Sequence, residues 1–206
     1  MSRLVGVVGS RSLPACAEHG RGIPYSLLVH TVVSLLSAQG YGIASGGALG
    51  ADAFALSSLL GQGIASRSVL FSAWPSVSGF PVAVRPQVSR FLASGGQVVW
   101  GSFSQQACPP ELQRRRVVSA LLGRNRRLVS SSSALVAFLH GESRGSLFTV
   151  RQAVARGLPR ATSGSEESRG IPVFVFLCGG ACPELSRGGA VLPADLSAHC
   201  HVMDFN

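Results

Sequence analysis

Apolar runs of strand length recur along the chain, and segments whose apolar residues repeat at helical spacing separate them. Most runs are nearly continuous in Val, Ile, Leu and Phe, which is typical of strands covered on both faces. The expected strands are residues 4–8, 41–44, 68–71, 97–100, 134–139 and 172–177, and the expected helices are 25–38, 51–60, 84–93, 111–122 and 147–155. This alternation predicts an α/β fold with a mostly parallel sheet of about six or seven strands and helices on both faces.

Little in the pattern divides the chain into separate parts. Its 206 residues lie within the usual size of one domain, so we expect a single domain over residues 1–206. Segments 74–81 and 160–170 have the Pro, Gly and Ser content of loops but are too short to separate domains. The weakly periodic residues 178–206 are expected to form a C-terminal extension that packs on the sheet edge. With neither a membrane-length apolar run nor a signal-type amino terminus, the expected location is the cytoplasm.

Three turns rich in glycine and serine each follow one of the expected strands. They are Gly9-Ser10-Arg11, Ser45-Gly46-Gly47-Ala48-Leu49-Gly50 and Gly141-Glu142-Ser143-Arg144-Gly145-Ser146. The carboxyl ends of parallel strands form one rim of a sheet, so we expect these turns to converge on one crevice lined with backbone N–H groups. Such a crevice is a site for phosphate, which limits the function to binding a nucleotide or a nucleic-acid backbone.

Each turn offers particular groups to an anion. Gly9 permits a tight reversal, the Ser10 hydroxyl and nearby amides can surround an anion, and Arg11 can close over it. The second turn has small residues where a backbone must approach a ligand, but it matches neither the dinucleotide-binding fingerprint nor the nucleoside triphosphate loop. Asp52, in the first turn of the following helix, complements the helix dipole, and this capping role is at least as well supported as a catalytic one.

The charge of the chain strengthens the interpretation that it binds phosphate. The formal net charge is +9, and all 18 basic residues are Arg, which binds phosphate through paired hydrogen bonds. Six of the arginines fall within residues 114–127, although such a run is also typical of a solvated helix face. Within it, Asn125 adds a directional amide between Arg124 and Arg126, and we expect these three residues to form a clamp.

Candidate residues for catalysis or metal binding are scarce. The cysteines are odd in number and scattered, and the spacing of the candidate zinc ligands is poor for a structural zinc site; these ligands are Cys178, Cys182, His199, Cys200 and His201. The five histidines have no obvious carboxylate partners in the sequence, and no nucleophile elbow occurs. We therefore expect no metal and no cofactor, and we favour binding over catalysis.

Four pieces of the sequence, taken in order, resemble the DNA-processing protein A family of the SLOG superfamily. They are Gly9-Ser10-Arg11, residues 45–52 ending at Asp52, Arg124-Asn125-Arg126, and Ser143-Arg144-Gly145-Ser146 followed by a helix. The resemblance implies a Rossmann-like, doubly wound core that binds single-stranded DNA, forms a homodimer and helps load the recombinase RecA onto DNA. It places the first turn, the glycines Gly46, Gly47 and Gly50, and residues 124–126 in the phosphate-binding groove. The chain departs from the family at Ala51, where Ile is usual, and at Phe54-Ala55, where a His is usual.

A second interpretation stays open, because residues 45–52 and 70–74 also resemble small SLOG proteins of the YspA-like group. That resemblance implies binding of a small nucleotide or a nucleotide-derived ligand in the same crevice. The lonely-guy phosphoribohydrolases are less similar, since their catalytic Glu has no counterpart in the helix after Ser146. We place nucleic-acid binding first on the net charge and the arginine cluster, with Phe80, Trp74 or Phe148 as candidates for stacking on a base.

Overall fold

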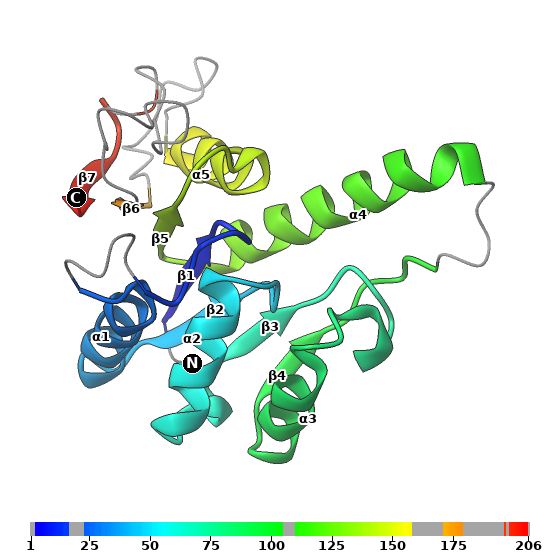
Figure 1. Ribbon diagram of the computed structural model, residues 1–206, viewed down its shortest axis with the longest axis horizontal. Coiled ribbons are helices and arrows are strands. Elements are labelled where there is room, and N and C mark those ends of the chain that lie inside the picture. Colours follow the sequence, from blue (N-terminus) through cyan, green and yellow to red (C-terminus); the bar gives the residue numbers. More distant parts are fainter. Residues whose placement is uncertain are drawn as a thin grey trace, which may run out of the picture.

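A parallel β-sheet forms the centre of the fold (Figure 1). The computed structural model describes residues 3–16, 23–104, 110–157, 171–178, 196 and 198–205. Within these residues seven strands pair in the order β4-β3-β2-β1-β5-β6-β7, and every pairing is parallel. The strands are β1 (Leu4–Gly9), β2 (Gly42–Ser45), β3 (Val69–Phe71), β4 (Gln97–Val99), β5 (Ala134–Leu139), β6 (Val173–Cys178) and β7 (His201–Phe205).

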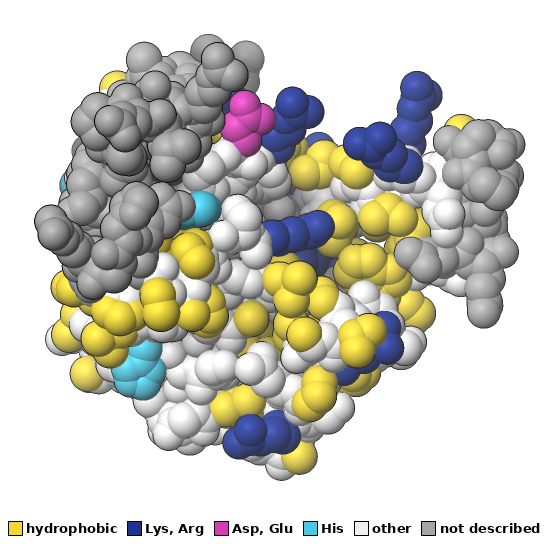
Figure 2. All heavy atoms as spheres, viewed as in Figure 1, with side chains coloured by type: hydrophobic (Ala, Val, Ile, Leu, Met, Phe, Trp, Pro, Cys, Tyr) yellow, Lys and Arg dark blue, Asp and Glu magenta, His cyan; other side chains and the backbone are white. Residues whose placement is uncertain are grey.

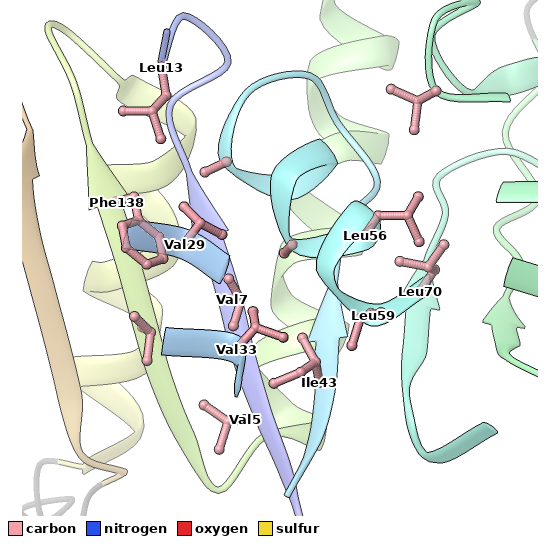
Figure 3. Packing of buried hydrophobic residues seen from close by; sticks show 14 of the residues in the cluster. Val5, Val7, Leu13, Val29, Val33, Ile43, Leu56, Leu59, Leu70 and Phe138 are labelled. Atoms are coloured by element: carbon pink, nitrogen blue, oxygen red, sulfur yellow. The ribbon is translucent and has the colours of Figure 1, made fainter. Parts of the chain in front are cut away.

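Helices pack on both faces of the sheet. They are α1 (Tyr25–Ala38), α2 (Ala51–Gly61), α3 (Arg85–Ala93), α4 (Pro110–Ser131) and α5 (Arg144–Gly157), with two short 3-10 turns, η2 (Ala65–Arg67) and η3 (Val77–Gly79). The first three helices share one buried cluster with the sheet, part of which Figure 3 shows, whereas α4 and α5 share a second cluster on the opposite face. The predicted Rossmann-like, doubly wound α/β fold is thus confirmed.

Burial on both faces of the sheet explains why most strands are nearly continuous apolar runs in the sequence. In β1, Val5 and Val7 belong to the cluster under α1 and α2, while Val8 belongs to the cluster under α4 and α5. All three side chains are at most 6% exposed. Removing a Val or Leu side chain from water contributes about 1.5–3 kcal/mol, so a polar residue at any of these positions would be costly.

The order of the strands creates a crevice beside β1. The chain proceeds from β1 through β2 and β3 to β4 on one side, then crosses over so that β5 pairs with β1 on its other side. In doubly wound sheets the loops at such a reversal diverge and leave a crevice at the carboxyl ends of the strands. The turns that follow β1 and β5 border this crevice.

Helix α4 is longer than the sequence pattern predicts. It continues through Gly123 to Ser131, whereas the expected helix ends at residue 122. The reason is tertiary packing: Leu128 and Val129 are buried in the cluster under β1 and β5, which outweighs the roughly 1 kcal/mol that a glycine costs a helix interior. Gly6 of β1 lets the helix lie close to the sheet, because a Cβ there would lie 2.9 Å from Leu128 Cδ2. Residues 124–127 are therefore helical.

Two smaller differences concern α5 and the end of the chain. α5 begins at Arg144 instead of residue 147, because the Leu147 N–H donates to Ser143 O (2.9 Å) and closes an earlier first turn. Residues 201–205, which are not among the six strands assigned by residue range but belong to the segment expected at the sheet edge, form β7 beside β6. The expected loop at 160–170, Cys182 and most of residues 179–200 lie outside the described residues. Among the helices that are described, none is long and apolar enough to cross a membrane.

Candidate functional site

A cavity of about 920 Å³ lies at the carboxyl ends of β1 and β5, between α4 and α5. The turn after β1, the start of α2, one face of α4 and the first turns of α5 form its walls. Figure 2 shows dark blue arginine side chains and yellow hydrophobic side chains together along the hollow where α4 leaves the body of the molecule. The structure thus brings the first and third turns together at the cavity, whereas the second turn contributes Ala48 alone to the lining.

Nine of the fifteen predicted site residues line the cavity: Gly9, Arg11, Asp52, Arg124, Asn125, Ser143, Arg144, Gly145 and Ser146. The other six do not line it: Ser10, Ser45, Gly46, Gly47, Gly50 and Arg126. The lining also includes residues that were not predicted, among them Arg114, Val118, Leu121, Phe148 and Arg151. Helical spacing is the signal that connects them, because Arg114, Val118, Leu121 and Asn125 follow one face of α4 at intervals of three or four residues.

The electrostatic character of the cavity is positive. Arg11, Arg114, Arg144 and Arg151 line it and are exposed to solvent. Two acidic residues also line it, Glu142 at the surface and Asp52 in the interior. Arginines that surround a concave surface concentrate anionic ligands there, because the low-dielectric walls focus the field.

Arg124 is buried, and its hydrogen bonds are made within the protein. The guanidinium Nη1 donates to Gly46 O (2.8 Å), and Nε and Nη2 donate to Asn125 Oδ1 (3.0 and 2.7 Å). The group lies flat against the second turn, since a Cβ at Gly46 would lie 2.6 Å from Arg124 Cζ. Arg124 therefore fixes the turn after β2 to α4, a role different from the ligand clamp that the sequence suggested.

Asn125 makes the matching connection to α5. Its Nδ2 donates to Thr149 Oγ1 (2.8 Å) and to Gly145 O (3.4 Å), while its Oδ1 accepts from Arg124. Asn125 is 7% exposed, so these bonds form largely out of water. Together Arg124 and Asn125 hold the second and third turns in a fixed relation across α4.

Burial sets the electrostatics of Asp52 and Arg124. Desolvation raises the pKa of Asp52 above its ordinary value, although the charges of Arg124 and Arg11 and a hydrogen bond from the Ala48 N–H to Oδ2 (3.2 Å) act in the opposite direction. Desolvation likewise lowers the pKa of Arg124, and the charge of Asp52 opposes that change. The two side chains are therefore coupled beneath the second turn, where Asp52 caps the backbone at Ala48.

The serines and glycines of the first two turns serve the fold. Ser10 is 1% exposed, and its Oγ accepts a hydrogen bond from the His140 N–H (2.7 Å), which joins the turns after β1 and β5. A Cβ at Gly9 would lie 2.5 Å from Ala51 Cβ, and one at Gly50, whose φ is 71°, would lie 2.2 Å from Ser10 O. Ser45 is fully buried, and its Oγ has no hydrogen-bond partner in the described part of the chain.

The start of α5 is the part of the site that faces solvent. Ser143 Oγ donates to Ser146 Oγ (2.7 Å), and a Cβ at Gly145 would have no atom within 4 Å among the described residues. The first N–H groups of a helix have no partner within the helix and attract anions. Nearby, the Arg126 guanidinium lies 5.3 Å from the Phe148 ring centroid, so a charged group and an aromatic face stand together at the rim.

The aromatic candidates separate by exposure. Phe80 is 2% exposed, so its ring cannot take a base, and the prediction that it stacks is wrong. Trp74 and Phe148 are half-buried and keep part of their surface in solvent. The sequence alone does not rank them, because Trp74 and Phe80 belong to the same loop-like segment and Phe148 to an expected helix, and neither context fixes the exposure of a ring.

Comparison with known proteins gives a consistent set of similarities. The family model for DNA recombination-mediator protein A matches residues 1–159. None of the curated protein sequences matches the chain. Among solved structures, DNA processing protein A from Helicobacter pylori is similar, with 21% identity, a TM-score of 0.56, and coverage of 84% of this chain and 65% of that one. That protein was described as having a unique single-stranded DNA binding mode.

Two further structures are similar in fold. DNA processing protein A from Streptococcus pneumoniae has 21% identity and a TM-score of 0.55, with coverage of 90% of this chain and 53% of that one. The structural-genomics target TM1055 has 16% identity and a TM-score of 0.52, with coverage of 98% of this chain and 92% of that one. The chain thus spans less than two thirds of the first two proteins' length.

Proposed function

Because the chain belongs to the DNA recombination-mediator protein A family, we propose that it binds single-stranded DNA in the cavity between α4 and α5 and acts in DNA processing and recombination. The observation that carries the proposal is the set of exposed arginines that line the cavity, formed by Arg11, Arg114, Arg144 and Arg151. The single-stranded DNA binding of the Helicobacter pylori protein supports the same ligand.

Phosphates are held at the start of α5. The free N–H groups of its first turn bind one phosphate together with Arg11 and Arg144, which line the same cavity. Arg114 and Arg151 extend the positive surface to the next phosphates along the strand. Two arginines can each approach a phosphate through paired N–H groups, which orients the backbone as well as attracting it.

The apolar wall of the cavity favours a single strand over a duplex. Val118, Leu121 and Leu122 of α4 face Leu147 and Phe148 of α5 across it. An unpaired base can leave solvent against such a wall, whereas the bases of a duplex are already stacked and paired. The same wall would accept the base of a mononucleotide, so the experiment must separate the two ligands.

Several properties that the family resemblance implies extend the proposal. We include among them a homodimer, a RecA-type recombinase as partner, a cytoplasmic location, a place in the wider SLOG superfamily and nucleotide binding in the same cavity. We also propose that residues 1–206 form one domain, with residues 178–206 as an extension that packs on the sheet edge. The recombinase partner and the homodimer are properties of a whole protein, and we state them as proposals because this chain covers only part of the length of its larger relatives.

Fluorescence anisotropy of a labelled oligothymidine over a series of salt concentrations tests the function. The wild type should bind at low salt, with log affinity falling linearly with log salt concentration. The pair Arg11→Ala with Arg144→Ala should weaken binding at least tenfold and reduce the slope by about 0.7 for each phosphate that the variant no longer neutralises.

The matched control is Arg3→Ala, which removes an exposed arginine at the amino end of β1, away from the cavity. It should leave both affinity and slope close to those of the wild type. Absence of oligonucleotide binding at low salt, or equal binding by the double variant, contradicts the proposal. A thermal shift with a panel of mononucleotides but no oligonucleotide binding would favour the small-nucleotide interpretation instead.

A further inference from the structure

An aromatic pair stands at the carboxyl end of β4, outside the cavity. Trp100 directly follows the strand and is 36% exposed, and its ring meets the buried ring of Phe80 at a centroid distance of 6.2 Å and an angle of 74°. This edge-to-face contact is a favoured aromatic geometry. Phe80 therefore packs against the indole ring while part of the Trp100 side chain stays open to solvent.

The backbone around Trp100 is fixed by several hydrogen bonds. Arg127 of α4 donates through Nη1 to Trp100 O (3.0 Å) and through Nη2 to Ser72 O (2.6 Å). The next residue, Gly101, donates its N–H to Trp74 O (3.1 Å). Arg127 follows Arg124 by one helical turn, so the same helix holds both the turn after β2 and the backbone at Trp100. An exposed indole on such a fixed backbone loses little freedom when it meets a ligand.

Packing connects this position with the cavity. A Cβ at Gly47 would lie 2.6 Å from Phe80 Cε1, so Phe80 packs directly against the second turn. The next residue of that turn, Ala48, lines the cavity. Trp100, Phe80 and the second turn are thus packed one against the next along the carboxyl edge of the sheet, with Trp100 as the member that is exposed to solvent.

We propose that Trp100 is a second base-stacking site for the single strand, which leaves the cavity over the turn after β2 and continues to the end of β4. This inference rests on the proposed function, because it needs a nucleic-acid strand in the cavity. Every base has an aromatic face, so stacking on Trp100 adds affinity without selecting a sequence. Since the indole is uncharged, its contribution differs from that of the arginines in one measurable way: it leaves the salt dependence unchanged.

Intrinsic fluorescence makes the proposal directly testable, because the chain contains two tryptophans, Trp74 and Trp100. In Trp74→Phe, the emission comes from Trp100. Titration of this variant with an unlabelled oligothymidine should quench the emission in proportion to binding, because a stacked base accepts an electron from the excited indole. A mononucleotide, which fills the cavity alone, should not quench it.

Affinity measurements complete the test. Trp100→Ala should weaken oligothymidine binding about tenfold with the slope against salt unchanged, whereas Trp100→Phe, which keeps an aromatic face, should retain most of the affinity. Urea unfolding of both variants identifies any loss of binding that comes from a loss of folding.

The outcomes separate this inference from the proposed function. If the wild type binds the oligonucleotide, but Trp100→Ala binds equally well and Trp100 emission is unquenched, the second site is wrong and the cavity proposal stands. The same result is expected if the exposed apolar surface at Val99 and Trp100 serves a protein partner instead, so that result overturns the inference as well. If the wild type does not bind, the proposed function fails, and this inference fails with it.

Discussion

Removal of the Arg124 guanidinium tests how the site is held together. Arg124→Met keeps an unbranched side chain but removes the donors to Gly46 O and Asn125 Oδ1 and the positive charge near Asp52. Loss of one member of a buried charged pair costs about 3–5 kcal/mol, because the other member stays buried without compensation. We expect Arg124→Met to lower the free energy of unfolding by about that amount at pH 8, a large part of the roughly 5–15 kcal/mol of a typical domain.

The pH dependence of this loss follows from Asp52. Burial already raises the pKa of Asp52 in the folded protein above 3.8, and without Arg124 the pKa rises further. A carboxyl group with a raised folded pKa binds its proton more tightly in the folded state. Its stability contribution is therefore greatest below the unfolded pKa and is lost as pH rises through the folded pKa. Because that interval is wider in Arg124→Met, the deficit relative to the wild type should grow from pH 4 to pH 8.

Urea unfolding at pH 5 and pH 8 measures both effects. The set comprises the wild type, Arg124→Met, Asp52→Asn and the double variant. In the Asp52→Asn background no charge is left buried, so Arg124→Met should cost about 1–3 kcal/mol less than it does alone. Strictly additive effects, or a deficit that is equal at the two pH values, would refute the coupling of Asp52 with Arg124.

Three further predictions concern glycines. Gly145→Trp should change the free energy of unfolding by less than about 1 kcal/mol but weaken oligothymidine binding at least tenfold, because the new side chain enters the cavity. The control Gly123→Trp changes a glycine outside the cavity lining and should keep the wild-type affinity. Anisotropy curves that are equal for the two variants would contradict this prediction. Gly123→Ala should raise the free energy of unfolding by about 1 kcal/mol in urea, since helix propensity improves and nothing among the described residues obstructs the methyl group. Gly50→Ala should lower the free energy of unfolding by at least about 2 kcal/mol, seen as a lower Tm, because φ is 71° and the new Cβ would lie 2.2 Å from Ser10 O.

The parts of the fold that the sequence predicts well are those with both faces buried. β5 and α1 have the bounds that the apolar pattern predicts, and the other predicted strands differ by one residue at one or both ends. The end of α4 could not be predicted locally. Gly123 is a reasonable helix terminator in isolation, and only the burial of Leu128 and Val129 against β1 and β5 carries the helix past it.

The same error hid the roles of the residues that follow Gly123. On a continuing helix, Leu121, Arg124, Asn125 and Leu128 share one face, which places Arg124 and Asn125 inside and leaves Arg126 at the surface. The adjacent positions in Arg124-Asn125-Arg126 therefore have different tasks, although the sequence alone presents them as one clamp. The apolar pattern places Trp100 in a strand, where a large apolar residue is ordinary, and only its exposure in the structure distinguishes it.

A glycine in a turn that follows a strand is ambiguous evidence for a phosphate-binding site until its surroundings in the fold are known. At Gly9, Gly46 and Gly50 an added Cβ would collide with the protein itself, so the fold requires these glycines whether or not a ligand binds. Gly145 differs, because no described atom lies within 4 Å of its Cβ position and its φ lies outside the left-handed region. Since another residue would fit there and would favour the helix, packing gives no reason for a glycine at the cavity wall. Close approach of the DNA backbone to the start of α5 supplies such a reason. Gly145 is therefore the glycine whose replacement separates an effect on ligand binding from an effect on folding.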